Sequence, residues 1–376
     1  MPESQTAFPI PPYIPQFDGI RAVSILAVFV AHSEFMRALP HASFLEYGRV
    51  GVDLFFVLSG FLITGILLDS KSSPNYFRNF YARRALRIWP LYYLLLALIF
   101  LVLPAFNSSM RSAAHLIWPY FSVYVQNLFI HLPTPFGLEP TWSLAIEEQF
   151  YISWPVLVAL LRKRDLAILL SCLIGLSFSL RIVGYEHGAS LKFIHNFTLC
   201  RLDAISFGSL SAIWLRSRYC TLELWLRTGR RLIVVGVLGT VVARATFGSE
   251  STVFSYTFIA AGFTGFLCVA LASDLQESFL ARALSLEFLR YVGKISYGLY
   301  LLHMPIFLLV DGSARGWLLR FKSSILGNLI GTIAQFVLAF LIASLSWRFF
   351  ETPILRLKSF FPSGSQLHSQ TLSERI

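Results

Sequence analysis

The sequence predicts an all-α fold, a polytopic transmembrane bundle of about ten spans with one further helix that is re-entrant or interfacial. The first observation is composition: 56% of the 376 residues are hydrophobic, only 14% are charged, and the mean hydropathy is +0.64. The second is that apolar segments of roughly 20 residues, the length that crosses hydrocarbon, recur along nearly the whole chain. No soluble domain of ordinary size fits between them. We therefore expect a membrane domain over residues 17–353, a cytoplasmic segment over 1–16 and a disordered cytoplasmic tail over 354–376.

Ten segments have the length and apolar character of spans. They are residues 19–36, 50–69, 89–106, 143–161, 165–185, 196–216, 231–248, 252–273, 295–311 and 325–348. An eleventh segment, residues 112–131, is interrupted by polar residues and proline, and we expect it at the outer face as the re-entrant or interfacial helix. If it also crossed, the basic cluster at residues 162–164 would lie outside, against the positive-inside tendency. With ten spans, both termini are cytoplasmic.

A membrane protein with basic cytoplasmic loops also explains the positive net charge. The chain carries 31 Lys and Arg against 20 Asp and Glu, a net charge of +11. These residues stand in short clusters beside apolar segments, as in cytoplasmic loops that contact membrane lipids, so no nucleic-acid partner is expected. The four cysteines and eight histidines show no metal-ligand spacing, and no metal site is expected. The sequence also lacks the motifs of nucleotide hydrolases, zinc proteases and serine hydrolases.

The first predicted span carries Arg21 near its start and His32 near its end. Eleven residues of helix rise about 16 Å in three turns, so the two side chains share one face. We expect Arg21 at the cytoplasmic mouth and His32, a possible base, in the outer half. The alternatives are that Arg21 only anchors the helix at the lipid headgroups and that His32 is a hydrogen-bonded interior histidine.

The fourth span carries two adjacent carboxylates, Glu147 and Glu148, one turn into an apolar helix. Charged groups at membrane depth are costly, which disfavours a purely structural role for both. They point about 100° apart on the helix, so only Glu147 shares a face with Ser143 at i+4.

A basic and aromatic segment follows the second span and contains Arg83, Arg84 and Arg87. Three guanidinium groups within five residues offer bidentate contacts to phosphate. The alternative is an anchor on the cytoplasmic face that binds anionic lipid.

Further charged groups map to mid-membrane or the outer half, and we predict that they bind substrate: Asp53, Arg201, Asp203 and His303. The alternatives are an interface carboxylate for Asp53, an ion pair with a neighbouring helix for Arg201 and Asp203, and polar packing within the bundle for His303. In the second span, Gly60 is expected to allow a close helix approach.

Several blocks of the sequence together resemble acyltransferase family 3. Arg21 and His32 are followed, in the family's order, by blocks at residues 50–63, 81–92, 142–151, 201–208, 293–305 and 346–353. The resemblance covers residues 13 to 353. The family consists of membrane proteins that move acetyl or other short acyl groups onto hydroxyls of sugars, polysaccharides and macrolides.

The resemblance implies that acyl-CoA, in particular acetyl-CoA, is the co-substrate and that Arg21 and His32 are essential. Coenzyme A is strongly anionic, so we expect Arg21 and the three arginines of the basic segment to bind it. His32 is then the general base on the acceptor hydroxyl, oriented by Glu147. A covalent acyl-imidazole on His32 is the alternative.

The expected function is therefore a multi-pass O-acyltransferase of the cell inner membrane, with a sugar or polysaccharide acceptor at the outer face. Some family members carry an extracytoplasmic hydrolase-like domain after the membrane core, which this sequence, ending at Ile376, does not include. That domain is usual in members that acetylate peptidoglycan, so the resemblance counts against peptidoglycan as the acceptor and leaves the acceptor's identity open. The competing classes are a proton-coupled transporter or exporter that uses the same buried His, Glu and Asp groups, and a non-enzymatic partner of polysaccharide export.

Overall fold

All regular elements in the described part of the chain are helical, which confirms the all-α prediction for those residues. The computed structural model describes residues 13–33, 50–106, 108–129, 134, 137–274, 278–313 and 325–362. The longer helices are α1 (Pro15–His32), α3 (Gly51–Ser70), α4 (Tyr76–Ala97), α6 (Ser108–Ser122), α7 (Thr141–Leu160), α8 (Lys163–Glu186), α10 (Leu202–Leu215), α11 (Leu222–Phe247), α12 (Ser251–Asp274), α14 (Glu287–Lys294), α15 (Ser296–Ser313) and α17 (Ile325–Ser346). The shorter ones are η2 (Leu98–Val102), α5 (Leu103–Phe106), η3 (Gln126–Leu128), α9 (Leu191–Asn196), η4 (Thr198–Cys200), η5 (Gly248–Glu250), α13 (Phe279–Leu284), η6 (Trp347–Glu351), α18 (Thr352–Arg356) and η7 (Leu357–Phe360).

Each of the ten predicted spans overlaps a helix or a pair of helices, but ten membrane crossings are not confirmed. Among the described residues, five helices are long and apolar enough to cross a membrane: Gly51–Ser70, Tyr76–Ala105, Lys163–Glu186, Val253–Ser273 and Leu326–Phe360. A sixth results if α14 and α15, which meet at a bend of 69°, form one broken span. These apolar helices make the chain a multi-pass membrane protein.

The other predicted spans are too short or too polar to pass the same criterion. Helix α10 has 14 residues and rises about 21 Å, less than the roughly 30 Å of the hydrocarbon core. The prediction began this span at residue 196, whereas the helix begins at Leu202, after the short η4 turn. Helix α7 carries Glu147 and Glu148 inside its apolar sequence.

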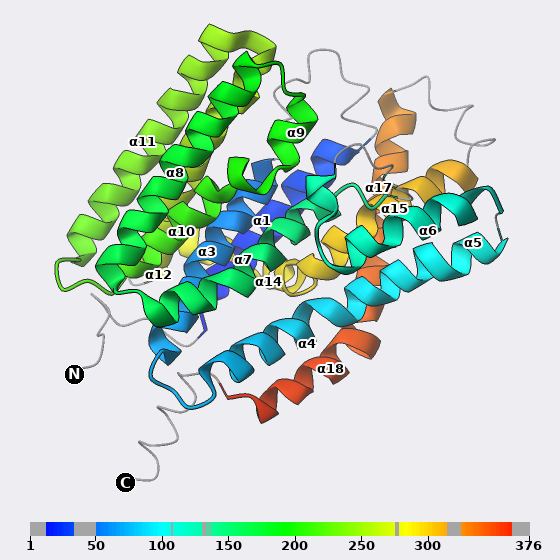
Figure 1. Ribbon diagram of the computed structural model, residues 1–376, viewed down its shortest axis with the longest axis horizontal. Helices are drawn as coiled ribbons and strands as arrows, with labels where there is room; N and C mark the ends of the chain where they lie inside the picture. The colour runs from blue at the N-terminus through cyan, green and yellow to red at the C-terminus, as the bar shows by residue number, and fades with distance from the viewer. Residues whose placement is uncertain are drawn as a thin grey trace.

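Helices α8, α10, α11 and α12 stand together at one end of the bundle in Figure 1, and α10 joins them to α3. Helices α3 and α10 approach at backbone distance because both contribute glycine. A Cβ on Gly60 would lie 2.1 Å from the Ile205 carbonyl oxygen, and one on Gly208 would lie 1.9 Å from that of Val57. The predicted close approach at Gly60 is confirmed.

Helix α4 begins at Tyr76, well before the predicted span at residue 89, and continues through η2 and α5 as one 30-residue helix. The arginines of the basic segment therefore belong to the same helix as the span. Helix α6, which covers part of the predicted re-entrant segment, has 15 residues and lies beside α4. Tyr92 and Tyr93 of α4 donate hydrogen bonds to its last carbonyls, at Phe121 and Ser122, each at 2.8 Å.

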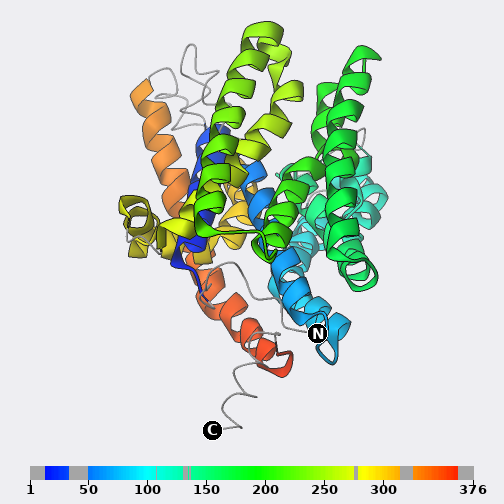
Figure 2. The same ribbon diagram turned by 90° about the vertical axis from the view of Figure 1, so that its left-hand side faces the viewer.

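Helix α17 continues through π-helical η6 into α18 and η7 as one long element (Figure 2). The segment expected to be a disordered tail from residue 354 is thus helical as far as Phe360. The physical reason is a set of hydrogen bonds from α4. Arg83 donates to the carbonyls of Lys358 and Phe361, and Asn79 donates to that of Pro362. Residues 363–376 of the tail, and 1–12 of the N-terminal segment, lie outside the described residues.

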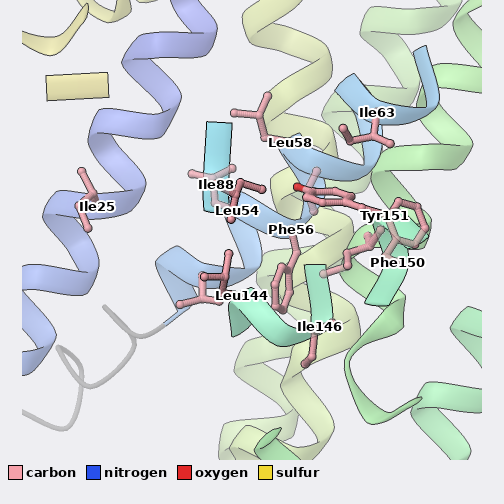
Figure 3. Close-up of a cluster of buried hydrophobic side chains, with 14 of the residues drawn as sticks. Ile25, Leu54, Phe56, Leu58, Ile63, Ile88, Leu144, Ile146, Phe150 and Tyr151 are labelled. Atoms are coloured by element: carbon pink, nitrogen blue, oxygen red, sulfur yellow. The ribbon is translucent and has the colours of Figure 1, made fainter. Parts of the chain in front are cut away.

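The centre of the bundle is apolar and is built by α1, α3, α4 and α7. Figure 3 shows side chains of α3 and α7 gathered around one another, with Ile88 of α4 beside them and Tyr151 at their edge. Phe56 and Leu58 are almost fully buried in this cluster. The polar side chains described next lie against this apolar packing.

Candidate active site

The first of two neighbouring cavities, which we call the arginine cavity, has a volume of about 140 Å³ and lies between α1, α3, α4, α7 and α15. Arg21, Arg84, Arg87 and Glu147 line it together with apolar and hydroxyl side chains. Three guanidinium groups against one carboxylate give its charged lining an excess of positive charge. Such a cavity favours an anionic ligand.

Arg84 and Arg87 lie one helical turn apart on the same face of α4. Arg84 stacks against Phe80 and Tyr151, with its Cζ atom 5.8 and 5.7 Å from the ring centroids, and Arg87 lies 5.4 Å from the ring of Trp347. Within the described residues, neither guanidinium has an ion pair or a hydrogen bond with the protein. Aromatic faces thus hold both groups in place while their N–H donors stay available to a ligand.

Arg83 does not line this cavity. Its guanidinium donates to the backbone carbonyls of Lys358 at 3.3 Å and Phe361 at 2.9 Å. Successive residues on a helix point about 100° apart, so Arg83 and Arg84 cannot share a face. The structure therefore brings together Arg84 and Arg87 of the predicted coenzyme A site, but separates Arg83 from them.

Arg21 lines the cavity from α1 and is fixed by Asp18, whose Oδ1 accepts its Nη1–H at 2.7 Å. The other oxygen of Asp18 accepts a hydrogen bond from Tyr13. The Arg21 side chain is 30% exposed, so it lies at the open side of the cavity. This is consistent with the expectation that Arg21 stands at a mouth.

Glu147 is held on both carboxylate oxygens. Ser59 donates to Oε1 and Tyr151 donates to Oε2, each at 2.9 Å. The expected contact between Glu147 and His32 is not formed, since Glu147 lines the arginine cavity and its hydrogen bonds all go to Ser59 and Tyr151. Glu148 points elsewhere and accepts a hydrogen bond from Trp89 at 3.2 Å.

The second cavity, the histidine cavity, has a volume of about 280 Å³ and contains His32. The Nδ1 atom of His32 lies 2.9 Å from the Val28 carbonyl oxygen. A carbonyl only accepts, so Nδ1 carries the proton and the lone pair of the neutral ring is on Nε2. This is the tautomer that a general base at Nε2 requires.

The neighbour of His32 is His303, whose ring centroid lies 5.3 Å from that of His32. His303 is fully buried, and its Nδ1 donates to the carbonyl of Tyr300 at 2.7 Å. His303 therefore stands behind His32 and does not line the cavity. Of the residues predicted to bind substrate, His303 alone lies beside the cavity histidine.

The two cavities meet at Tyr300 and Val52, which line both. The Tyr300 hydroxyl donates to the Pro140 carbonyl at 2.8 Å and lies 2.5 Å from the hydroxyl of Ser143. We call this contact the neck. A group that passes between the arginine and histidine cavities has to pass these side chains.

Asp53, Arg201 and Asp203 line neither cavity and form buried ion pairs instead. Arg201 pairs with Asp53 at 2.7 Å, and Asp203 pairs with Arg181 at 2.8 Å. All four side chains are at most 1% exposed. This arrangement corresponds to the alternative interpretation, in which charges from neighbouring helices pair with one another. The pairs join α3 to the start of α10 and α8 to α10.

Sequence reasoning did not single out Arg181, although the signal was present: it is an arginine inside the apolar segment at residues 165–185. It also contacts Thr257 and the Cys200 carbonyl. Trp142 and His195 of the histidine cavity were also missed as site residues. A single tryptophan at a helix start and a histidine in a connecting segment give no pattern that would have identified them.

Removal from water raises the pKa of the Glu139 carboxyl in the connection before α7, and the positive charge of Lys192 acts in the opposite direction. Both residues line the histidine cavity, so its rim carries one acidic and one basic side chain. Among the described residues, no group of three or more metal-ligating side chains is found.

Comparison with known proteins gives a consistent result. A family model described as an acyltransferase domain, that of acyltransferase family 3, matches residues 14–348. The peptidoglycan O-acetyltransferase OatA of Listeria monocytogenes is 30% identical over 366 residues, which is 91% of this chain and 56% of that protein. The O-acetyltransferase OatA of Staphylococcus aureus is 28% identical over 374 residues, 93% of this chain and 58% of that protein. The chain thus spans a little over half the length of these relatives. No solved structure matches.

Proposed function

The chain belongs to this acyltransferase family, and we propose that it is a membrane-bound O-acyltransferase that moves an acetyl or other short acyl group from acyl-CoA to a hydroxyl of a sugar or polysaccharide. One observation carries the proposal. A cavity with unpaired guanidinium groups adjoins, across the neck, a cavity that contains a histidine in the tautomer of a general base.

In this proposal the arginine cavity binds the donor. Arg84 and Arg87 bind phosphate oxygens of acyl-CoA, with Arg21 at the open side. A cavity of about 140 Å³ is too small for a whole nucleotide coenzyme, so the nucleotide stays at the mouth and the pantetheine arm enters. The arm carries the thioester toward the neck. Arg21 and His32 lie about 16 Å apart along α1, a distance that a long, flexible arm suits better than a compact donor.

The chemistry takes place on the histidine side of the neck. His32 Nε2 removes the proton of the acceptor hydroxyl as that oxygen attacks the thioester carbonyl. The carbon–sulfur bond then breaks, the thiolate takes the proton back from the imidazolium, and free coenzyme A thiol and an ester result. Protons and charge balance without a further reactant. Glu147, held by Ser59 and Tyr151, limits the excess positive charge of the donor cavity and keeps Tyr151 oriented under Arg84.

The relatives support an acceptor that is a polysaccharide. The Listeria protein is named for peptidoglycan, which runs against the expectation of a different acceptor. We therefore propose an acceptor hydroxyl on a glycan, and the test below distinguishes peptidoglycan from other bacterial polysaccharides.

We place the protein in the cell inner membrane with both termini cytoplasmic, the donor entering from the cytoplasm and the acceptor at the outer face. The cluster of Arg83, Arg84 and Arg87 beside Lys358 supports this orientation, because basic residues concentrate on the cytoplasmic side. Reporter fusions after Arg164 and after Ile376 test it. An extracytoplasmic signal at either position would overturn the orientation.

The function is tested with purified protein in detergent, supplied with acetyl-CoA and either soluble peptidoglycan strands or another bacterial polysaccharide. We expect thiol release that depends on the glycan and matches the ester formed. A double Arg84→Gln, Arg87→Gln variant provides the control for background hydrolysis. Absence of thiol release with every glycan, in protein that is folded, would contradict the enzyme and favour a transporter.

A further inference from the structure

The histidine cavity continues into a second space beside it. This side chamber has a volume of about 30 Å³ and is lined by Gln126, Asn127, Thr141 and the rings of Phe121 in α6 and Phe129, which directly follows η3. The residues that line both spaces are Thr134, Glu139, Trp142, Lys192 and Asn196. The two spaces are therefore one groove that passes over Trp142, with His32 at one end only.

The indole ring of Trp142 forms a flat surface in this groove, and its neighbours hold it in place. Trp142 is the second residue of α7, and it is packed by the ring of His195 at 4.5 Å and by the edge of Phe56 at 6.1 Å. The Cζ atom of Arg201 lies 5.7 Å from its ring, so the buried ion pair with Asp53 supports it from behind. Within the described residues no hydrogen bond engages its indole N–H, which remains a donor to a ligand.

The polar rim of the groove is balanced in charge. Lys192 and Glu139 carry opposite charges, and the side chains of Lys192 and Asn196 have no hydrogen bond to another described residue. Asn127, by contrast, holds the groove rigid: its amide donates to the Asn196 carbonyl and the Thr198 hydroxyl, and it accepts from Gln149. The arginine cavity selects an anion, whereas this groove offers donors, acceptors and an aromatic face to a neutral, hydroxyl-rich ligand.

We propose that the groove binds two consecutive units of a neutral glycan, with Trp142 as the platform between them. The unit whose hydroxyl reacts lies in the histidine cavity beside His32. The neighbouring unit crosses Trp142 and places an exocyclic group in the side chamber, whose volume holds a substituent and not a whole ring. This inference rests on the proposed function and adds to it that the acceptor is a chain and that its second unit is recognised.

The experiment measures acceptor length dependence with chito-oligosaccharides of one to four units as the probe. We expect the KM of the acceptor to fall from one unit to two and to change little beyond two, because the groove contacts only two. An equal KM for one and two units would overturn the inference while leaving acyl transfer intact. Titration of the same oligosaccharides into the protein without acyl-CoA gives the second readout. Length-dependent binding without transfer would overturn the proposed function and leave the groove as a glycan site.

Two variants test whether the groove recognises the glycan. Trp142→Leu and Lys192→Gln should each raise the KM of the disaccharide by about tenfold, the equivalent of about 1.4 kcal/mol, and leave the KM of acetyl-CoA unchanged. Lys192 is exposed, so its variant tests the groove even if Trp142→Leu fails to fold. Trp118→Leu, at an exposed tryptophan of α6 outside the groove, is the matched control. An unchanged length dependence in both groove variants would overturn the role of Trp142 and Lys192.

Discussion

The two cavities are built from different parts of helices. The arginine cavity takes its charged groups from within helices: Arg21 from the second turn of α1, Arg84 and Arg87 from α4, and Glu147 from α7. The histidine cavity takes most of the polar groups that it does not share with the arginine cavity from helix ends and connections: His32 is the last residue of α1, Trp142 is near the start of α7, and Glu139 lies in the connection before it. Residues within helices are held by packing on both sides, whereas ends and connections tolerate change. In the proposed function, the arginine cavity is therefore the more constant of the two sites and the histidine cavity the more variable.

His32→Ala should have the largest effect, because it removes the proposed reacting group from the histidine cavity and leaves the arginine cavity intact. We expect kcat to fall about 10²–10⁴-fold, the usual loss for a general base, with the KM of acetyl-CoA retained. Acyl transfer is measured as ester formed and as thiol released.

The matched control is His187→Ala. His187 makes the same local contact as His32, from Nδ1 to the carbonyl four residues earlier at 2.9 Å, but at the exposed end of α8. It should retain full activity. His303→Ala should lose less than His32→Ala, since His303 stands behind the cavity. Full activity in His32→Ala would rule out the mechanism.

Arg84→Gln and Arg87→Gln alter the arginine cavity and leave the lining of the histidine cavity unchanged. Each removes charge-assisted hydrogen bonds worth about 1.5–3 kcal/mol, so the KM of acetyl-CoA should rise roughly tenfold or more. The KM of the glycan should stay the same. A rise in the glycan KM instead would mean that the two cavities do not divide donor and acceptor between them.

The sequence identified more of the charged lining of the arginine cavity than of the groove over Trp142, and the reason is physical. Glu147 was identified as a charge inside an apolar segment, where burial of charge is costly. Arg84 and Arg87 were identified as clustered guanidinium groups beside a span. Clustering could not tell Arg83 from Arg84, because the tail that binds Arg83 is close in space and distant in sequence.

A single sequence likewise does not show how each helix is rotated about its own axis relative to its neighbours. Glu147 was expected to contact His32, yet α7 directs it to Ser59 and α15 directs His303 to His32. The same limit applies to Asp53 and Arg201, whose charges were recognised but whose mutual pairing was not.

Substitutions of Tyr300 test whether the neck keeps the two cavities separate. Tyr300→Phe removes the hydroxyl that contacts Ser143 and Pro140, and Tyr300→Ala removes the ring as well. We expect water to reach the thioester, so that thiol release exceeds ester formation by roughly 2–10-fold, the range expected for loss of one hydrogen bond. The two products are measured in the same reaction. A ratio that stays at one in both variants would show that Tyr300 does not separate donor and acceptor.

Arg83→Gln should have the smallest effect on acyl transfer, because Arg83 is adjacent to Arg84 in sequence but contacts the tail and not the arginine cavity. Its guanidinium donates to the carbonyls of Lys358 and Phe361, so the substitution should weaken the attachment of α18 and η7 to α4 by about 1 kcal/mol. Limited proteolysis should then cut within residues 354–362 faster than in the unaltered protein, while the KM of acetyl-CoA stays the same. Arg78→Gln, which removes only a guanidinium 5.3 Å from the ring of Phe361, should accelerate cleavage less. If Arg83→Gln raised the KM of acetyl-CoA as much as Arg84→Gln does, all three arginines would bind the donor. The assignment of Arg83 to the tail and of Arg84 and Arg87 to the arginine cavity would then be wrong.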